Sequence, residues 1–147
     1  SIYRAYKRGS YEHAAPDDLA GKKVRLGAYG DPAAVPGAIW STFLKAALAV
    51  VGYTHQMMHK NFDPIALQWS MVSADAPKQA ERYQADGHAT YRILKPGQDL
   101  LPGESLCPSE MGVSCADCLA CDGQGGSFAI PAHGPRADRK LKLKVTS

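Results

Sequence analysis

The residues best suited to chemistry in this sequence are its four cysteines, which all lie within one short stretch near the carboxyl end. They follow the pattern C-x7-C-x2-C-x2-C and are Cys107, Cys115, Cys118 and Cys121. Thiolates crowded this closely repel one another unless a cation lies between them, and a thiol that coordinates a metal ion is deprotonated. The spacing therefore predicts a metal site, with two small disulfide loops as the alternative.

The arrangement of these cysteines favours an iron–sulfur cluster over zinc. Zinc sites usually combine two separate cysteine pairs, whereas three of these cysteines share one overlapping run from Cys115 to Cys121. Bacterial ferredoxins ligate [4Fe–4S] clusters with such a run and a further Cys-Pro. Cys107-Pro108 supplies that dipeptide, although upstream of the run. We therefore expect all four cysteines to hold a [4Fe–4S] cluster, with zinc as the second candidate cofactor.

Length and composition describe the protein that carries this site. With 147 residues, 45% hydrophobic and 21% charged, the chain is long and apolar enough for one globular domain with its own core. A net charge of +3 is too small to indicate nucleic-acid binding by itself. No apolar run is long enough to span a membrane, no leader peptide is visible, and bunched cysteines fit a reducing compartment. We expect a cytoplasmic protein without a membrane partner.

Three segments follow from the distribution of charge. Residues 1–23 form a basic arm, residues 24–134 an α/β domain with the metal loop at 107–121, and residues 135–147 a basic tail. The tyrosines of the arm either pack on the domain, which is the favoured interpretation, or stack on bases while lysines contact phosphate. Nucleic acid is therefore a partner that the basic termini allow. The sequence leaves the oligomeric state open.

Alternating strand and helix patterns must position the metal loop. Strands are predicted at 24–30, 53–56, 68–75, 88–94, 104–106 and 127–132, and helices at 36–48, capped by Gly52, and at 77–85. This alternation implies right-handed crossovers and a parallel sheet. Short links favour strands in sequential order. We predict a small, mainly parallel sheet or a partial (βα) barrel with a C-terminal cysteine-rich metal-binding loop.

Polar residues follow several of these strands, where sites in parallel sheets gather. The candidate ligand face consists of Tyr29, Asp31, His55, Asp75, Arg92 and His133. Ordinary structural roles compete with this interpretation. Asp31 precedes a proline and suits a turn, Asp75 suits a helix N-cap, and histidines at strand ends are often hydrogen-bonded core residues.

Four motifs together resemble a family of uncharacterised phage and prophage proteins. They are residues 25–36, residues 52–56, the cysteine loop from Cys107 to Cys121, and residues 130–134, so that the resemblance covers about residues 20–134. It implies a role in phage or prophage biology in the cytoplasm of a bacterial host, but no particular activity and no catalytic residue.

The strand series is also loosely similar to the (βα) core of radical S-adenosylmethionine enzymes. Those enzymes carry C-x3-C-x2-C near the amino end and keep one iron open for the cofactor. This chain has four cysteines near the carboxyl end. A fully ligated cluster has no open iron, which argues against radical chemistry.

Three functions are therefore considered. The leading one is an iron–sulfur protein with a binding or regulatory role, in which the four cysteines order a loop and sense redox state. The second is an enzyme that uses Asp31, His55, Asp75 and Arg92 on a small molecule or a nucleic-acid end. The third is a zinc-stabilised structural or nucleic-acid-binding domain.

Overall fold

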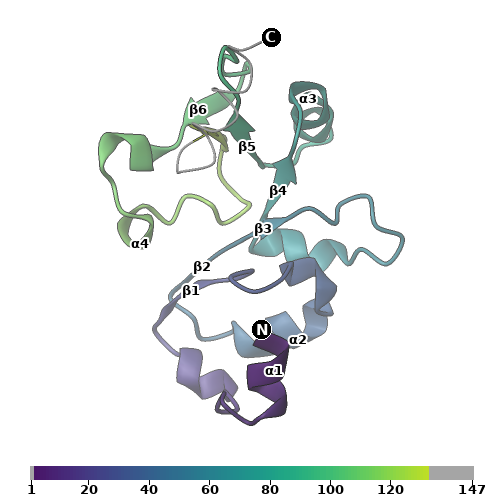
Figure 1. Ribbon diagram of the computed structural model, residues 1–147, viewed down its shortest axis with the longest axis vertical. Coiled ribbons are helices and arrows are strands. Elements are labelled where there is room, and N and C mark those ends of the chain that lie inside the picture. Colours follow the sequence, from purple (N-terminus) through teal and green to yellow (C-terminus); the bar gives the residue numbers. More distant parts are fainter. Residues whose placement is uncertain (1, 133–147) are drawn as a thin grey trace.

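The computed structural model describes residues 2–132, whose strands form two sheets (Figure 1). The smaller sheet pairs β1 (Lys23–Arg25) with β2 (Ala49–Val51). The larger sheet has the order β3-β4-β5-β7-β6 and consists of β3 (Tyr53–Thr54), β4 (Met71–Ala74), β5 (Thr90–Leu94), β6 (Glu104–Leu106) and β7 (Ser127–Pro131). All neighbouring strands are parallel. The predicted α/β class with a parallel sheet is confirmed.

The larger sheet is open, with β3 and β6 at its edges and β7 between β5 and β6. The predicted sequential strand order is therefore wrong for the last two strands. Parallel neighbours need a crossover of about a dozen residues or more. The segment 107–126, which carries all the cysteines, is that crossover between β6 and β7. The cysteine loop is thus part of the topology of the sheet.

Short helices and turns connect the strands. The α-helices are α1 (Ile2–Lys7), α2 (Gly37–Phe43), α3 (Pro77–Ala85) and α4 (Cys115–Cys118), and the 3-10 turns are η1 (Pro16–Leu19), η2 (Pro32–Ala34), η3 (Pro64–Gln68) and η4 (Pro108–Met111). The predicted helix at 77–85 is confirmed with the same bounds. Within residues 2–132, none of the helices has the length and apolar character needed to cross a membrane.

The two faces of the larger sheet have different covers. Helix α3 packs on one face, where Ala80 and Tyr83 meet Val72 and Ala74 of β4. The loop that carries η4 and α4 lies on the other side of the sheet (Figure 1). Successive side chains of a strand point to opposite faces. Neighbouring residues of β4, β5 and β7 therefore belong to different environments.

The helix predicted at 36–48 ends at Phe43, and the chain then forms β2. The three residues of β2 are too few to show the alternation of a strand, and they pair with β1, which is distant in the sequence. Gly52 is not a helix cap. Its N–H donates to the Cys121 carbonyl at 3.1 Å, and a Cβ there would lie 2.7 Å from Ser70 Oγ. The missing side chain allows close packing against Ser70, and the N–H of this glycine holds the cysteine loop at Cys121.

The tyrosines of the N-terminal arm do not pack on the domain as predicted. Tyr3, Tyr6 and Tyr11 are exposed, and the ammonium group of Lys7 lies 5.7 Å from the centre of the Tyr3 ring. A six-residue helix has too few apolar neighbours to bury them. Contact of this arm with nucleic acid stays a prediction. The basic tail at 135–147 lies outside the described residues.

Candidate functional site

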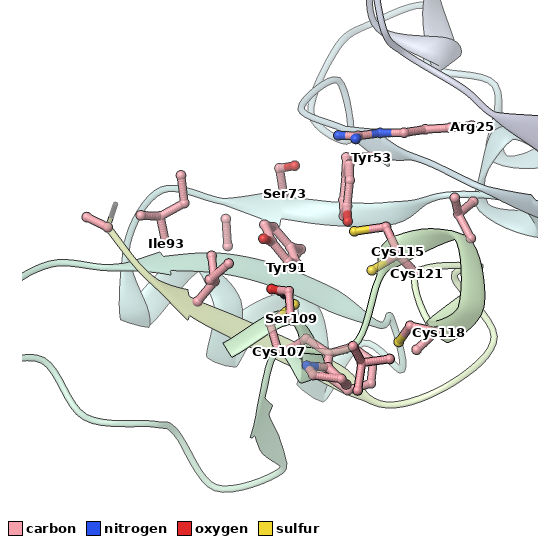
Figure 2. A pocket seen from close by; sticks show the side chains of 18 of the residues that line it. Arg25, Tyr53, Ser73, Tyr91, Ile93, Cys107, Ser109, Cys115, Cys118 and Cys121 are labelled. Carbon is pink, nitrogen blue, oxygen red and sulfur yellow. Dashed lines mark hydrogen bonds between the residues drawn. The ribbon is translucent and has the colours of Figure 1, made fainter. Parts of the chain in front are cut away.

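The four cysteines line one pocket, which lies between the cysteine loop and one face of the larger sheet and has a volume of about 1100 Å³. All four are free thiols, so the alternative of paired disulfides is not what the structure contains. Figure 2 shows their side chains gathered beside Tyr53 and Tyr91. We call this cavity the cysteine pocket. The metal site predicted from these four residues stays a prediction, and the structure shows that they line the same pocket.

The cysteines come from two different settings. Cys107 directly follows β6, is only 8% exposed, and donates its N–H to the Ala129 carbonyl of β7 at 2.8 Å. Its thiol shares a hydrogen bond of 3.1 Å with the Ser109 hydroxyl. The run of three lies on and after α4, where Cys115 is exposed and the other two are half-buried. One thiol is thus fixed to the sheet, and three belong to the surface loop.

Contacts near its middle and at its carboxyl end hold the loop against β1 and η3. Near its middle, Lys23 Nζ donates to the Ala116 carbonyl at 2.7 Å. At its carboxyl end, Gln124 Nε2 donates to the Leu67 carbonyl at 3.1 Å. Between them lies Gly123, which has a φ of +82° and leaves no room for a side chain, since a Cβ would lie 2.5 Å from the Ser70 carbonyl oxygen. These contacts set the position of Cys121.

The run of cysteines includes a residue in an unfavourable backbone conformation. Leu119 has a φ of 52°, and within residues 2–132 it is the one non-glycine residue with positive φ. The left-handed region costs a side chain such as leucine about 1–2 kcal/mol. Such residues persist where their surroundings determine them, and they cluster at binding sites. Here the conformation turns the chain between Cys118 and Cys121.

Electrostatic effects couple the thiols to the two tyrosines. Burial raises the pKa of the Cys121 thiol, a hydrogen bond from Tyr53 opposes the rise, and the other three cysteines add to it. Burial, followed by the hydrogen bond to Cys121, raises the pKa of Tyr53. Burial and nearby cysteines raise the pKa of Tyr91 to about 12. Near pH 7 the Cys121 thiol and both phenols therefore carry their protons.

The four thiols do not form a ready-made site for a single metal ion. Within residues 2–132, no three His, Cys, Asp or Glu side chains lie close enough together to hold one metal ion. Zinc needs its sulfur ligands about 2.3 Å away on all sides, a closeness that this arrangement lacks. Four cysteines ligate a [4Fe–4S] cluster, and each binds a different iron atom. The ligand sulfurs of a cluster therefore lie farther apart than those around one ion.

Apolar and aromatic side chains form the wall opposite the loop. The rings of Tyr53 and Tyr91 lie 4.6 Å apart between centroids at an interplanar angle of 46°. Phe128 pairs with Tyr91 across the strands, and Ile130 pairs with Ile93, and all of these residues line the pocket. Sequence reasoning missed this wall. The alternation of large side chains along residues 91–93 and 128–130 was the signal that pointed to it.

Two of the predicted ligand-face residues reach the rim of the pocket. His55 Nε2 lies 3.9 Å from Asp75 Oδ1, and the side chains are 63% and 86% exposed. The alternative role of Asp75 as an N-cap is wrong, because Ala76 occupies that position and no side chain caps α3. The pair is an open, polar edge at the carboxyl ends of β3 and β4.

Other predicted residues do not join the pocket. Asp31 is a turn residue, as its alternative interpretation held, since its carboxylate accepts hydrogen bonds from Thr54 Oγ1, the His55 N–H and the Ala33 N–H at 2.7, 2.7 and 2.9 Å. Tyr29 is 77% exposed and lies away from the pocket lining. His133 lies outside the described residues.

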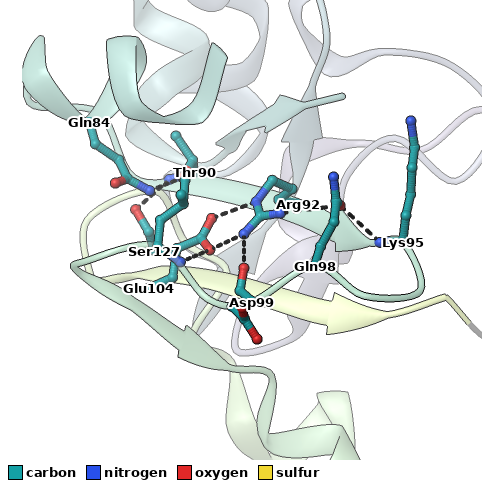
Figure 3. Close-up of polar contacts among 9 residues, drawn as sticks. Gln84, Thr90, Arg92, Lys95, Gln98, Asp99, Glu104 and Ser127 are labelled. Atoms are coloured by element: carbon teal, nitrogen blue, oxygen red, sulfur yellow. Dashed lines mark hydrogen bonds and ion pairs between the residues drawn. The ribbon is translucent and has the colours of Figure 1, made fainter. Parts of the chain in front are cut away.

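Arg92 lies on the opposite face of the sheet, so its predicted place at the ligand face is wrong. It is 1% exposed, and Figure 3 shows its guanidinium group forming two hydrogen bonds to Glu104. The same group donates to the Asp99 carbonyl at 3.0 Å. The hydrogen bond to Glu104 raises the pKa of Arg92. Tyr91 and Ile93 face the pocket, and the strand period sends Arg92 the other way.

The fold and the site together define a small α/β protein with a four-cysteine pocket on one face of a parallel sheet. Comparisons of the chain with protein-family models, with curated proteins and with solved structures find no significant match. Its function is therefore argued from the geometry of the pocket.

Proposed function

We propose that this chain is an iron–sulfur protein with a binding or regulatory role, in which Cys107, Cys115, Cys118 and Cys121 hold a [4Fe–4S] cluster. The single observation that carries the proposal is that four free thiols from one crossover line the same pocket. Sulfur donors are the ligands of iron–sulfur centres, and an apolar surrounding limits solvent access to them.

The surroundings of the cysteines support this role. Cys107 gives a fixed attachment on the sheet, and the docked end at Gly123 gives a second. The exposed part of the loop between them is held by its own short turns and by the Lys23 contact, and metal ligation would add to its order. When bound, a cluster supplies one-electron chemistry or redox sensing. A change in the oxidation state of the cluster then alters the surface that the loop presents to a partner.

Metal analysis of anaerobically purified protein tests the proposal. We expect about four iron and four sulfide per chain and absorbance near roughly 400 nm. Changing any one of the four cysteines to serine lowers the iron content severely. Glu110→Gln is the matched control, because Glu110 is an exposed residue of the same loop and does not line the pocket. A colourless protein with stoichiometric zinc, or full iron in the serine variants, contradicts the proposal.

A second candidate is an enzyme, and the His55–Asp75 pair at the pocket rim is the observation that favours it. A histidine beside a carboxylate is a common arrangement for proton transfer. Of the four residues first considered for catalysis, this candidate keeps only these two. A role in phage biology, which the resemblance implies, stays a prediction. So does the zinc-stabilised domain, whose test is the same metal analysis.

A further inference from the structure

The cysteine pocket is larger than a metal centre beneath the loop needs. Its volume of about 1100 Å³ is at the upper end of the range for sites that bind small organic molecules. Its lining includes the four cysteines and also His55, Asp75, Ile93 and Lys95, which lie at the carboxyl ends of β3, β4 and β5, and we call this strand-end portion its second part. Figure 2 shows Ile93 far from Cys118, with the tyrosine pair between them. The second part has room for a ligand of its own.

The walls and the rim of this second part differ in chemistry. Ile93 and the rings of Tyr53 and Tyr91 form an apolar surface. The lining of the whole pocket carries two cations, Arg25 and Lys95, against one carboxylate, which already lies beside His55. An apolar floor with a few charged groups at its edge is the usual composition of a small-molecule site. Among the charged side chains of the lining, the cations can therefore bind an anionic group.

Arg25 is the cation best placed to bind such a group. Its guanidinium carbon lies 5.8 Å from the centre of the Tyr53 ring, and Figure 2 shows the side chain extending along the ring at the edge of the pocket. Within residues 2–132, it has no carboxylate partner. Stacking on an aromatic ring restricts the side chain and leaves its N–H groups free for carboxylate or phosphate, which they bind in pairs.

We propose that the cysteine pocket binds a small aromatic or apolar organic anion, with its carboxylate or phosphate on Arg25 and its apolar part on Tyr53, Tyr91 and Ile93. The site lies beside the proposed metal centre, and its wall of strand residues exists without a metal. A ligand there would contact both the sheet and the cysteine loop, so its binding would also change the order of the loop.

Equilibrium dialysis with two matched probes tests the proposal on the full chain. The probes are anilinonaphthalene sulfonate and phenylnaphthylamine, which share one ring system and differ in the anionic group. We expect the sulfonate to bind and Arg25→Gln to weaken it about tenfold, the effect of losing about 1.4 kcal/mol, while the neutral probe is unaffected. Arg82→Gln is the control, because it removes an equally exposed arginine from α3 on the opposite face. Phenylacetate and phenyl phosphate as competitors then distinguish carboxylate from phosphate.

Other results overturn the inference. The inference is wrong if the sulfonate does not bind. It is also wrong if Arg25→Gln and Arg82→Gln weaken the binding of the sulfonate equally. An equal loss for both probes means that Arg25 only shapes the pocket. Iron content is measured on the same samples. If the protein contains no iron but still binds the sulfonate through Arg25, only the proposed cluster is contradicted. If the protein contains iron but its binding of the sulfonate does not depend on Arg25, only the ligand site is contradicted.

Discussion

Residues next to one another in β5 belong to two regions with opposite character. Arg92 faces a closed network in which Glu104, Gln98 and the Asp99 carbonyl accept its hydrogen bonds (Figure 3). Tyr91 faces the cysteine pocket, which the four thiols and Arg25 also line, and within the described residues the Arg25 guanidinium group has no carboxylate partner. Both regions concentrate polar chemistry on the same sheet.

The two regions differ in whether their polar groups are hydrogen-bonded within the protein or accessible to a ligand. A buried polar group costs free energy unless it is satisfied, and the network around Arg92 is satisfied by the protein itself. In the cysteine pocket, by contrast, Cys115 and Arg25 are exposed and accessible to a ligand. A buried charge does not by itself mark a functional site. Arg92 is the most deeply buried charged residue of the two regions, and its role is to stabilise the fold.

The largest effect is expected from breaking the closed region. Glu104→Ala leaves the Arg92 charge buried without its partner, which costs about 3–5 kcal/mol in the free energy of unfolding. Urea denaturation measures this loss. Asp99→Asn is the control, because Arg92 contacts the main-chain carbonyl of Asp99 and not its carboxylate. Similar unfolding midpoints for the two variants would mean that the pair does not stabilise the protein.

The same pair predicts a dependence of stability on pH. Burial acts to raise the pKa of Glu104, but hydrogen bonds from Arg92 and the Leu101 N–H, together with the Arg92 charge, lower it overall. Its contribution is full above the unfolded pKa of about 4.3 and is lost as the pH falls from there through the folded pKa. The gap in stability between the wild type and Glu104→Gln should therefore shrink below about pH 4.3. If the difference in unfolding free energy between the two proteins stays constant below this pH, Glu104 is not the group responsible. Urea denaturation at several pH values measures this difference.

A smaller loss is expected where the loop docks. Gly123→Ala places a Cβ against the Ser70 carbonyl at a positive φ, which costs about 1–3 kcal/mol. Because the strain displaces Cys121, the iron content should fall as well. Gly126→Ala is the matched control, since no atom lies within 4 Å of its Cβ and its φ is not positive. Equal stability and equal iron content in the two variants would show that the docking contact is dispensable.

The two settings of the cysteines can be compared in metal-free protein. Cys107→Ser puts a hydroxyl into a buried position and should cost about 1 kcal/mol. Cys115→Ser changes an exposed side chain and should cost less than about 0.5 kcal/mol. Urea denaturation with a chelator present measures both. A larger loss from Cys115→Ser would mean that the loop, and not the sheet, anchors the site.

The smallest effect is expected at the exposed pair on the pocket rim. His55 and Asp75 are both mostly exposed, and such pairs contribute about 0–1 kcal/mol. Asp75→Asn should therefore leave the midpoint of thermal unfolding nearly unchanged. If the second candidate function is correct, the same variant would lower turnover while stability stays constant. A large loss of stability would show a structural role that the geometry does not indicate.

Sequence patterns predicted the elements best where they were local and long. Helix α3 has the bounds that its apolar spacing and Pro77 indicate, and β6 was located correctly. The strand at 49–51 was missed because three residues carry no usable period, and its pairing with β1 depends on residues more than twenty positions away. The tyrosines at the amino end were predicted to be packed, yet the structure leaves them exposed.

By itself, the sequence determined the α/β class and the parallel strands, and it put the four cysteines within one short stretch, because these depend on local periods and on spacing along the chain. Only the tertiary structure decided that β7 lies between β5 and β6, that Arg92 turns to Glu104, and that Tyr53, Tyr91 and Arg25 meet the cysteines. Which face of a sheet a residue joins depends on strand pairing between distant segments, and no local pattern contains that information.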